Sequence, residues 1–110
     1  MAQIEERLRA LGVDLPSLPA PLANYVPATC VGKLIFTAGQ VSSIDGQDYK
    51  GKLGAHRSLD EARAATKACA INCLTAIKSE AGTLDHITQV VAVHGLTNST
   101  LQCQEQAQAM

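Results

Sequence analysis

The sequence predicts an α+β domain, and three features of the chain lead to this prediction. Two runs of strand character surround Gly32, residues 59–81 carry the pattern of one long helix, and residues 87–96 are apolar on both alternating faces. The order strand, strand, helix, strand, without an internal repeat, is typical of layered α+β domains rather than of α/β barrels. At 110 residues, the chain has the length of a single domain.

Composition argues against several classes of function. Nine basic residues against ten acidic ones give a net charge of −1, and no run of Lys or Arg is present. With two Tyr, one Phe and no Trp, the chain also lacks a platform for stacking bases. No nucleic-acid partner is therefore expected. No window reaches the length of a membrane span, and residues 1–7 are too polar for a signal peptide, so we expect a cytoplasmic protein without a membrane partner.

The amino-terminal residues 2–11 predict a short amphipathic helix that ends at Gly12. Its apolar face contains Ile4, Leu8 and Leu11. Because so short a helix is unstable alone, we expect it to dock on the rest of the domain or on a neighbouring subunit. An extended connector follows, enforced by Pro16, Pro19 and Pro21.

Residues 25–31 and 33–41 predict a hairpin around Gly32. Pro27 lacks an amide donor, so its strand should lie at an edge or carry a bulge. Residues 42–54 contain Asp45-Gly46 and predict a loop with a short strand around Tyr49.

The long helix has clear start and stop signals. Ser58 and Glu61 form a capping box, and Gly82 follows the last helical residue, so the helix should span residues 59–81. Its predicted inner stripe comprises Ala62, Ala65, Cys69, Cys73, Ala76 and Ile77.

Residues 83–85 predict a turn or short helical hinge, and residues 87–96 predict a central strand covered on both faces. Residues 99–110 contain four Gln and one large aliphatic residue, Leu101. They predict a frayed, weakly helical tail.

The four cysteines are expected to be free, mostly buried thiols. They are Cys30, Cys69, Cys73 and Cys103. Cys69 and Cys73 could hold two metal positions on one helix face, but no second pair stands at zinc-site spacing, so no metal site is expected.

Few residues indicate a ligand-binding or catalytic role by themselves. Tyr25 could bind a ligand or be a strand aromatic, and Gly39 could admit a ligand or simply end a strand. Gln40 is expected to satisfy backbone groups, and Arg57 to be a solvated side chain rather than an anion site. The three histidines, His56, His86 and His94, are scattered and are expected to be structural or solvated.

A series of short segments follows along the chain in this order: Pro21…Tyr25, Gly32 to Gln40, Gly51 to Gly54, Leu59…Ala62, Ala70…Ala76, Gly82 to Asp85, and Val90 to Asn98. This series resembles the reactive-intermediate deaminase family (Rid, also YjgF-like or endoribonuclease L-PSP). The resemblance covers about residues 4–98, and the amino-terminal helix is similar to that of the longer-chain subgroup.

The resemblance implies a chorismate-mutase-like mixed sheet packed by helices, and homotrimers with small-molecule clefts between subunits. It implies cofactor-free hydrolysis of imines or enamines such as 2-aminoacrylate to a keto acid and ammonia, as by 2-iminobutanoate/2-iminopropanoate deaminases. Tyr25, Gly39 and Asn98 match residues of the family cleft. Ala38 replaces a common serine, so one hydroxyl contact is lost.

The resemblance stops near Asn98. Family members continue through further strands that carry a Pro-Ala-Arg segment and a late glutamate, whereas the last arginine here is Arg63 and the last acid is Glu105. We therefore expect a partial Rid-like domain over residues 1–98, lacking the last strands, and a divergent Gln-rich tail over 99–110.

Such a truncated chain should be impaired or inactive, its catalytic residues unknown, and it should be poorly soluble when expressed alone. The alternative is a non-enzymatic metabolite-binding or assembly protein that uses the same cleft. RNA cleavage, suggested by one family label, ranks last.

Overall fold

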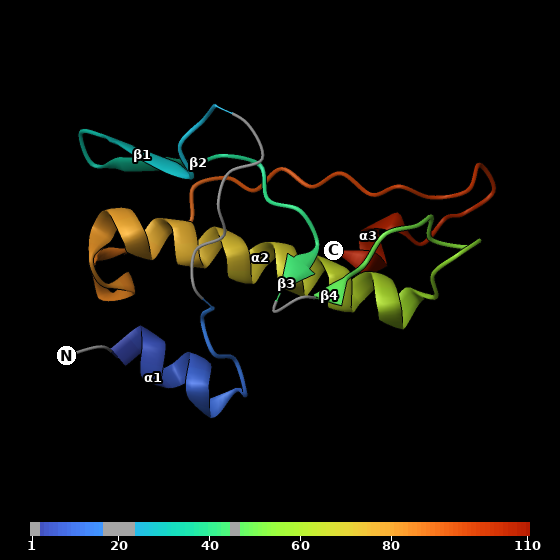
Figure 1. Ribbon diagram of the computed structural model, residues 1–110, viewed down its shortest axis with the longest axis horizontal. Helices are drawn as coiled ribbons and strands as arrows, with labels where there is room; N and C mark the ends of the chain where they lie inside the picture. The colour runs from blue at the N-terminus through green and yellow to red at the C-terminus, as the bar shows by residue number, and fades with distance from the viewer. Residues whose placement is uncertain (1–2, 17–23, 45–46) are drawn as a thin grey trace. The chain divides into compact units, whose positions relative to one another are not determined.

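The computed structural model describes residues 3–16, 24–44 and 47–110 (Figure 1). In chain order the elements are α1 Gln3–Ala10, β1 Ala28–Val31, β2 Leu34–Thr37, β3 Ser43–Ile44, β4 Gln47–Asp48, α2 Leu59–Ala81, the 3-10 helix η1 Leu84–His86, and α3 Gln106–Ala109. The α+β composition is confirmed. The predicted connector at Pro19 and Pro21 and the Asp45-Gly46 turn lie outside the described residues.

The chain forms two compact units. The first contains residues 1–40 and 71–90, and the second contains residues 41–70 and 91–110. Helix α2 passes from the second unit into the first.

In the first unit, β1 and β2 form the predicted antiparallel hairpin, with Cys30 opposite Ile35. The two-residue loop begins at Gly32, whose φ of 59° is a conformation that favours glycine. Both strands are shorter than predicted, because Pro27, which has no N–H, precedes β1. The Ala38 N–H donates to the Pro27 carbonyl at 2.8 Å just past the strands.

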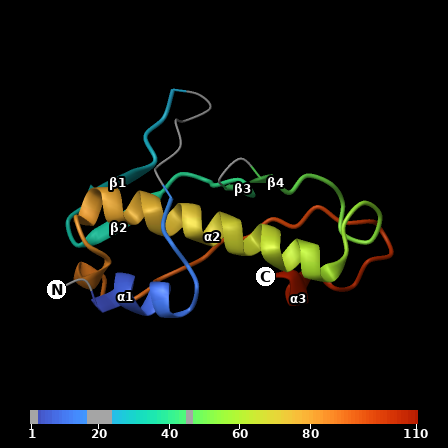
Figure 2. The same ribbon diagram turned by 60° about the horizontal axis from the view of Figure 1, so that its bottom comes forward.

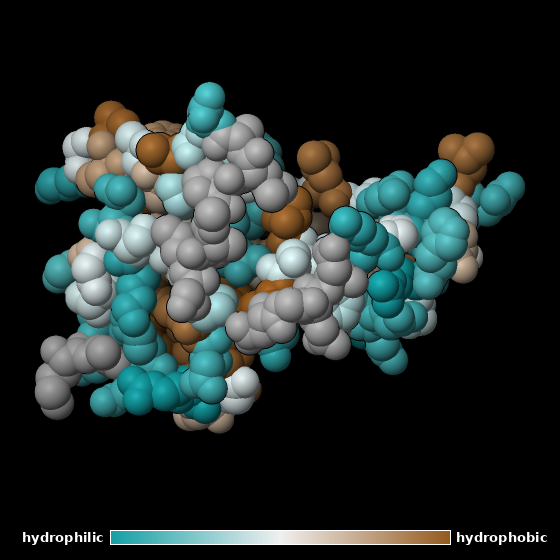
Figure 3. All heavy atoms as spheres, viewed as in Figure 1, coloured by the Kyte–Doolittle hydropathy of each residue, from teal (hydrophilic) through white to brown (hydrophobic). Residues whose placement is uncertain are grey.

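The register assigns the hairpin residues to two faces, since directly opposed residues share a face. One face carries Ala28, Cys30, Ile35 and Thr37, of which Ala28 is buried. The other face carries Thr29, Val31, Leu34 and Phe36, all exposed. We call these four residues the outer hairpin face, and hydrophobic atoms reach the surface over this part of the molecule (Figure 3).

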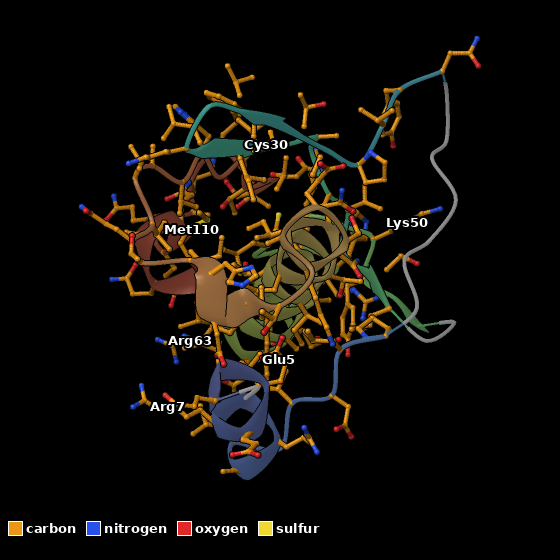
Figure 4. The ribbon with its side chains drawn as sticks, turned by 90° about the vertical axis from the view of Figure 1, so that its left-hand side faces the viewer. Glu5, Arg7, Cys30, Lys50, Arg63 and Met110 are labelled. Atoms are coloured by element: carbon orange, nitrogen blue, oxygen red, sulfur yellow. The ribbon has the colours of Figure 1, made fainter. Side chains whose placement is uncertain are left out.

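Helix α1 docks beside η1, as the sequence predicts (Figure 2). The Asp85 carboxylate accepts the N–H groups of Gln3 and Ile4 at 2.8 and 2.7 Å, and so caps the start of α1. In return, Glu5 points from α1 toward η1, where it accepts the Leu84 N–H at 2.9 Å and the Thr83 hydroxyl (Figure 4). Each helix is thus capped by a carboxylate from the other.

Helix α2 has the predicted bounds and the predicted capping box. The Ser58 N–H donates to Glu61 Oε1 at 3.1 Å, and the Glu61 N–H donates to Ser58 Oγ at 3.2 Å. Gly82 follows the helix with a φ of 82°, and its N–H donates to the Lys78 carbonyl. The capping chemistry visible in the sequence therefore sets both ends of this helix.

The predicted inner stripe of α2 is only partly correct. Its fully buried residues are Ala68, Asn72, Thr75 and Ala76, and only Ala76 belongs to the predicted set. The other predicted residues are half-buried. The buried stripe is rotated relative to the predicted one, because two polar residues, Asn72 and Thr75, face inward. The Thr75 hydroxyl donates to the Ile71 carbonyl at 2.9 Å, so it is satisfied within the helix.

In the second unit, β3 and β4 form a small antiparallel hairpin in place of the single strand expected around Tyr49. The Tyr49 N–H extends this pairing by donating to the Ser42 carbonyl at 3.0 Å. Buried Leu53 forms bridges to Arg57 and Ser99 and is part of this unit's core, together with Ala68 and Ala109.

The tail is more ordered than predicted. Its weak helical character is confirmed by α3, but the end is not frayed, because Ala109 is 1% exposed. Arg63 Nε donates to the Gln108 carbonyl at 2.9 Å, which fastens the tail to α2. Met110 lies against Gly95, where a side chain larger than hydrogen would displace it.

The prediction of a covered central strand over residues 87–96 is wrong. No strand is assigned there, and Val90, Val91 and Val93 are 69%, 75% and 76% exposed instead of covered. The apolar pattern indicates a strand, but a strand requires a hydrogen-bonding neighbour, and none of the described residues supplies one.

None of the four cysteines forms a disulfide, as expected, yet none is fully buried. Cys30 is exposed and the other three are half-buried. The cause is visible for Cys69 and Cys73, which lie beside the buried stripe of α2 rather than within it.

Candidate functional site

Tyr25 and Gly39 flank the same end of the β1–β2 hairpin. The Ala38 N–H donates to the Pro27 carbonyl at this end, and Tyr25 and Gly39 lie just beyond this bond on either side. Tyr25 is 42% exposed and Gly39 is also exposed. We call Tyr25 and Gly39 the hairpin rim.

The backbone of Gly39 is open. Its φ is not positive, and a Cβ placed on it would meet nothing within 4 Å. By contrast, Gly51 has a φ of 128° and its Cβ would lie 2.8 Å from that of His56. The fold therefore requires glycine at position 51 but not at position 39, which leaves room beside Gly39 for a group from outside the chain.

Asn98, the third predicted site residue, belongs to the second unit. Its backbone carbonyl accepts the Leu53 N–H at 2.9 Å, and the residue as a whole is exposed. The structure thus places Tyr25 and Gly39 at one end of the hairpin, whereas the Asn98 carbonyl forms a backbone hydrogen bond within the second unit.

The histidines are structural or exposed, as predicted. His56 Nδ1 accepts the Lys52 N–H at 3.2 Å, and His86 Nδ1 lies 2.7 Å from the Ala81 carbonyl oxygen. His94 is exposed on the segment that follows η1. Across the described parts of the chain, no three His, Cys, Asp or Glu residues are grouped to hold a metal ion.

Arg57 is more constrained than the predicted solvated side chain. Its Nη1 pairs with Glu61 Oε2 at 2.7 Å, its Nε donates to the Lys50 carbonyl at 2.9 Å, and its guanidinium carbon lies 5.9 Å from the centre of the Tyr49 ring. The Ser58 N–H and then Arg57 lower the pKa of Glu61 below its ordinary value of 4.5, which keeps the pair ionised.

Arg63 is likewise engaged, through the Gln108 carbonyl. The remaining arginines, Arg7 and Arg9, lie on α1. A carboxylate clamp needs an arginine whose planar fork is available to the ligand, and both arginines outside α1 already donate to groups of their own unit.

Comparison with known proteins decides the family. A family model described as "YjgF/chorismate mutase-like, putative endoribonuclease" matches residues 5–110, which include the tail after Asn98. The chain belongs to this YjgF/Rid family. No helix in the described part of this Rid-family chain combines the length and apolar character required to traverse a bilayer.

The relatives support the family and its fold. Protein TCP17 of Trypanosoma cruzi is 33% identical over 106 residues, which are 96% of this chain and 66% of that protein. A crystal structure of a "putative endoribonuclease" from Shewanella oneidensis has a TM-score of 0.90 at 35% identity, covering 96% of this chain and 70% of the other. A protein of unknown function from Agrobacterium tumefaciens has a TM-score of 0.84 at 33% identity, with 96% and 66% covered.

The Rid-family chain therefore has the YjgF/chorismate mutase-like α+β fold. It spans about two thirds of the length of the relatives it matches. Sequence reasoning identified the hairpin rim only through family motifs. The openness of Gly39 is a property of the backbone and leaves no mark in the sequence beyond the glycine itself.

Proposed function

We propose that this Rid-family chain contributes the hairpin rim to a cleft for small imines or enamines derived from amino acids. Within these 110 residues, we propose binding without turnover, so that the polypeptide alone is impaired as a deaminase. Tyr25 would line the ligand, Gly39 would let it approach the main chain, and Asn98 would supply an amide.

The open backbone of Gly39 carries this proposal. The fold does not require a glycine there, and the position stands beside an exposed tyrosine at the end of a paired hairpin. An exposed backbone next to an amphipathic ring is the arrangement that accommodates a small, flat, polar molecule.

Hydrolysis would demand more than binding. Water must add to the imine carbon, and the resulting carbinolamine must then lose ammonia to leave the keto acid. The first step needs a positioned water, the second needs a proton delivered to the leaving amine, and a cation would hold the substrate carboxylate through both. Arg57 already donates to Glu61 and Lys50, and Arg63 already donates through Nε to Gln108, so both side chains are held by groups of their own unit.

The neighbouring assignments are proposals of the same kind. We propose a cytoplasmic protein that needs no cofactor for this reaction, and a homotrimer whose subunits would share the clefts. We do not extend RNA cleavage to this chain, because a net charge of −1 gives no general attraction for phosphate backbones.

Binding can be tested with 2-oxobutanoate, the stable keto acid that hydrolysis of 2-iminobutanoate yields. Titration of the isotope-labelled chain, followed by NMR, should shift the Gly39 amide and the Tyr25 ring. Gly39→Ala should abolish these shifts, because its methyl group occupies the approach to the backbone. Lys33→Ala, in the loop at the opposite end of the hairpin, is the control and should leave them unchanged. Equal shifts in the wild type and Gly39→Ala would remove the rim from consideration.

Turnover is tested separately. 2-Iminobutanoate is generated from threonine by a dehydratase, and the appearance of 2-oxobutanoate is followed with and without the purified chain. We expect no acceleration over the spontaneous rate. A clear acceleration that Gly39→Ala removes would show a working deaminase and overturn the proposed impairment.

A further inference from the structure

We propose that Met110 is a redox-sensitive contact: oxidation of its thioether by a peroxide detaches α3 from the rest of the second unit. The contacts that carry this proposal all lie within that unit. The proposal is independent of the metabolite binding at the hairpin rim.

Met110 closes the tail onto the segment that precedes it. Its Sδ and Cε lie against the backbone of Gly95, and a Cβ on Gly95 would overlap both atoms. Between these two residues, the Gln106 side-chain amide donates to Ser99 Oγ at 3.0 Å. Residues 95–110 are therefore folded on themselves, and the thioether fills the space that glycine leaves free.

Helix α3 depends on contacts with its surroundings. It lies beside the first half of α2, within the same unit (Figure 2). Arg63 Nε donates to the Gln108 carbonyl, and Ala109 is 1% exposed. Because a helix of four residues is not stable by itself, its position rests on such anchors, and the contact of Met110 next to buried Ala109 is one of them.

The Met110 side chain is accessible to a small oxidant, since the residue is 53% exposed. Its sulfur attacks one oxygen of hydrogen peroxide, and an S–O bond forms as the O–O bond breaks. The proton of the attacked oxygen passes to the departing hydroxide, which leaves as water. The sulfur is thereby oxidised by two electrons, and the peroxide is reduced. The product is a polar sulfoxide whose oxygen favours water over the Gly95 backbone, so the contact is weakened.

Cleavage by a glutamyl endopeptidase reports whether the tail is open. Glu105 is exposed at the start of α3 and is the one acidic residue of positions 99–110. After treatment with hydrogen peroxide and its removal, cleavage behind Glu105 should be at least about fivefold faster, because proteases cut the locally opened chain. Cleavage behind Glu6, on α1 in the first unit, is the internal control and should keep its rate.

Two variants separate Met110 from the other oxidisable residues, which are Met1 and the four cysteines. Met110→Leu keeps an apolar side chain beside Gly95 but has no sulfur, so peroxide should leave its cleavage behind Glu105 unchanged. Met110→Gln places a polar side chain of similar length there and should be cut faster without peroxide. In the oxidised wild type, methionine sulfoxide reductase with a dithiol should restore slow cleavage, whereas the dithiol alone should not.

Mass spectrometry measures the extent of oxidation at Met110 in the same samples. Equal acceleration by peroxide in the wild type and in Met110→Leu would assign the effect to the cysteines or Met1, and would overturn the proposal. Complete oxidation of Met110 with cleavage behind Glu105 still slow would also overturn it, as would a Met110 that resists oxidation under conditions in which free methionine reacts.

Discussion

Two glycines of this chain have opposite reasons for being glycine. At Gly51 a φ of 128° and a Cβ position 2.8 Å from the His56 Cβ both exclude a larger residue. At Gly39 neither restriction applies. The fold thus explains the first glycine, while the second is the one for which we propose an approaching ligand.

This contrast predicts different stability effects. Gly51→Ala should lower the free energy of unfolding by about 1–3 kcal/mol, because it forces a side chain into a backbone region reserved for glycine. Gly39→Ala should change it by no more than about 0.5 kcal/mol. Urea unfolding followed by circular dichroism measures both. Equal losses of unfolding free energy in the two variants would show that the fold also requires glycine at position 39.

Single residues also differ in whether their roles could be predicted from the sequence. Ser58 and Glu61 were recognisable because a capping box is a local pattern with fixed spacing. The burial of Asn72 was not, because whether an amide on a helix faces inward depends on distant parts of the chain. The hairpin rim lies between these cases, since its place on the hairpin was predictable and its openness was not.

At the scale of elements, we expect the capping box of α2 to contribute measurably to stability. Ser58→Ala removes the oxygen that accepts the Glu61 N–H, and should lower the unfolding free energy by about 1 kcal/mol. Ser79→Ala is the control on the same helix, because Ser79 only bonds the Ala76 carbonyl near the other end. We expect the control to stay within about 0.5 kcal/mol of the wild type. A Ser58→Ala effect no larger than that of the control would mean that packing alone determines the start of α2.

The attachment of α1 to η1 should depend on pH. The Leu84 N–H lowers the pKa of Glu5 below its ordinary 4.5, assisted by Thr83 and by Lys78 of α2. The Ile4 and Gln3 N–H groups lower the pKa of Asp85 below its ordinary 3.8, assisted by the positive amino terminus and His86. Since both pKa values are depressed on folding, the stabilisation is complete above about pH 4.5 and is lost as the pH falls through the folded values.

Amide exchange in α1, measured from pH 7 down to pH 3, should therefore accelerate beyond its intrinsic pH dependence at the acid end. Glu5→Gln should weaken the attachment of α1 at neutral pH, with a smaller difference from the wild type in acid. Glu6→Gln is the matched control, because Glu6 is the exposed neighbour on the same helix. An effect of Glu6→Gln equal to that of Glu5→Gln would show that net charge, not the reciprocal capping, matters.

The existence and type of elements that depend on local chemistry were predictable, and those of elements that depend on partners were not. The bounds of α2 follow from its own caps, and the β1–β2 hairpin follows from Gly32 and its flanking runs. The strands came out shorter because Pro27 supplies no amide donor. The segment at residues 87–96 has the composition of a strand, but the neighbour it needs is absent from the described residues.

At the scale of the whole molecule, the chain presents two apolar surfaces, the outer hairpin face and the exposed Val90, Val91, Val93 and Leu96 of residues 88–97. Monomeric proteins rarely expose contiguous apolar groups of this kind without using them. We therefore expect the chain to be poorly soluble when expressed alone, and for reasons that can be located. If these two surfaces cause the precipitation, a charge placed on each should relieve it, whereas the same charges placed elsewhere should not.

The double variant Leu34→Lys with Val91→Lys tests this, with Leu11→Lys and Leu101→Lys as its control. Both doubles add the same two positive charges, and both replace exposed apolar residues. The first should remain in solution at clearly higher ammonium sulfate concentrations than the wild type, because it interrupts both surfaces, while the second should precipitate with the wild type. Equal gains in the two doubles would show that the loss of any two exposed apolar side chains raises the solubility, and that these two surfaces have no special part in it. The matched charge change makes the comparison specific, since the net charge goes from −1 to +1 in both variants and only the first variant interrupts the two apolar surfaces.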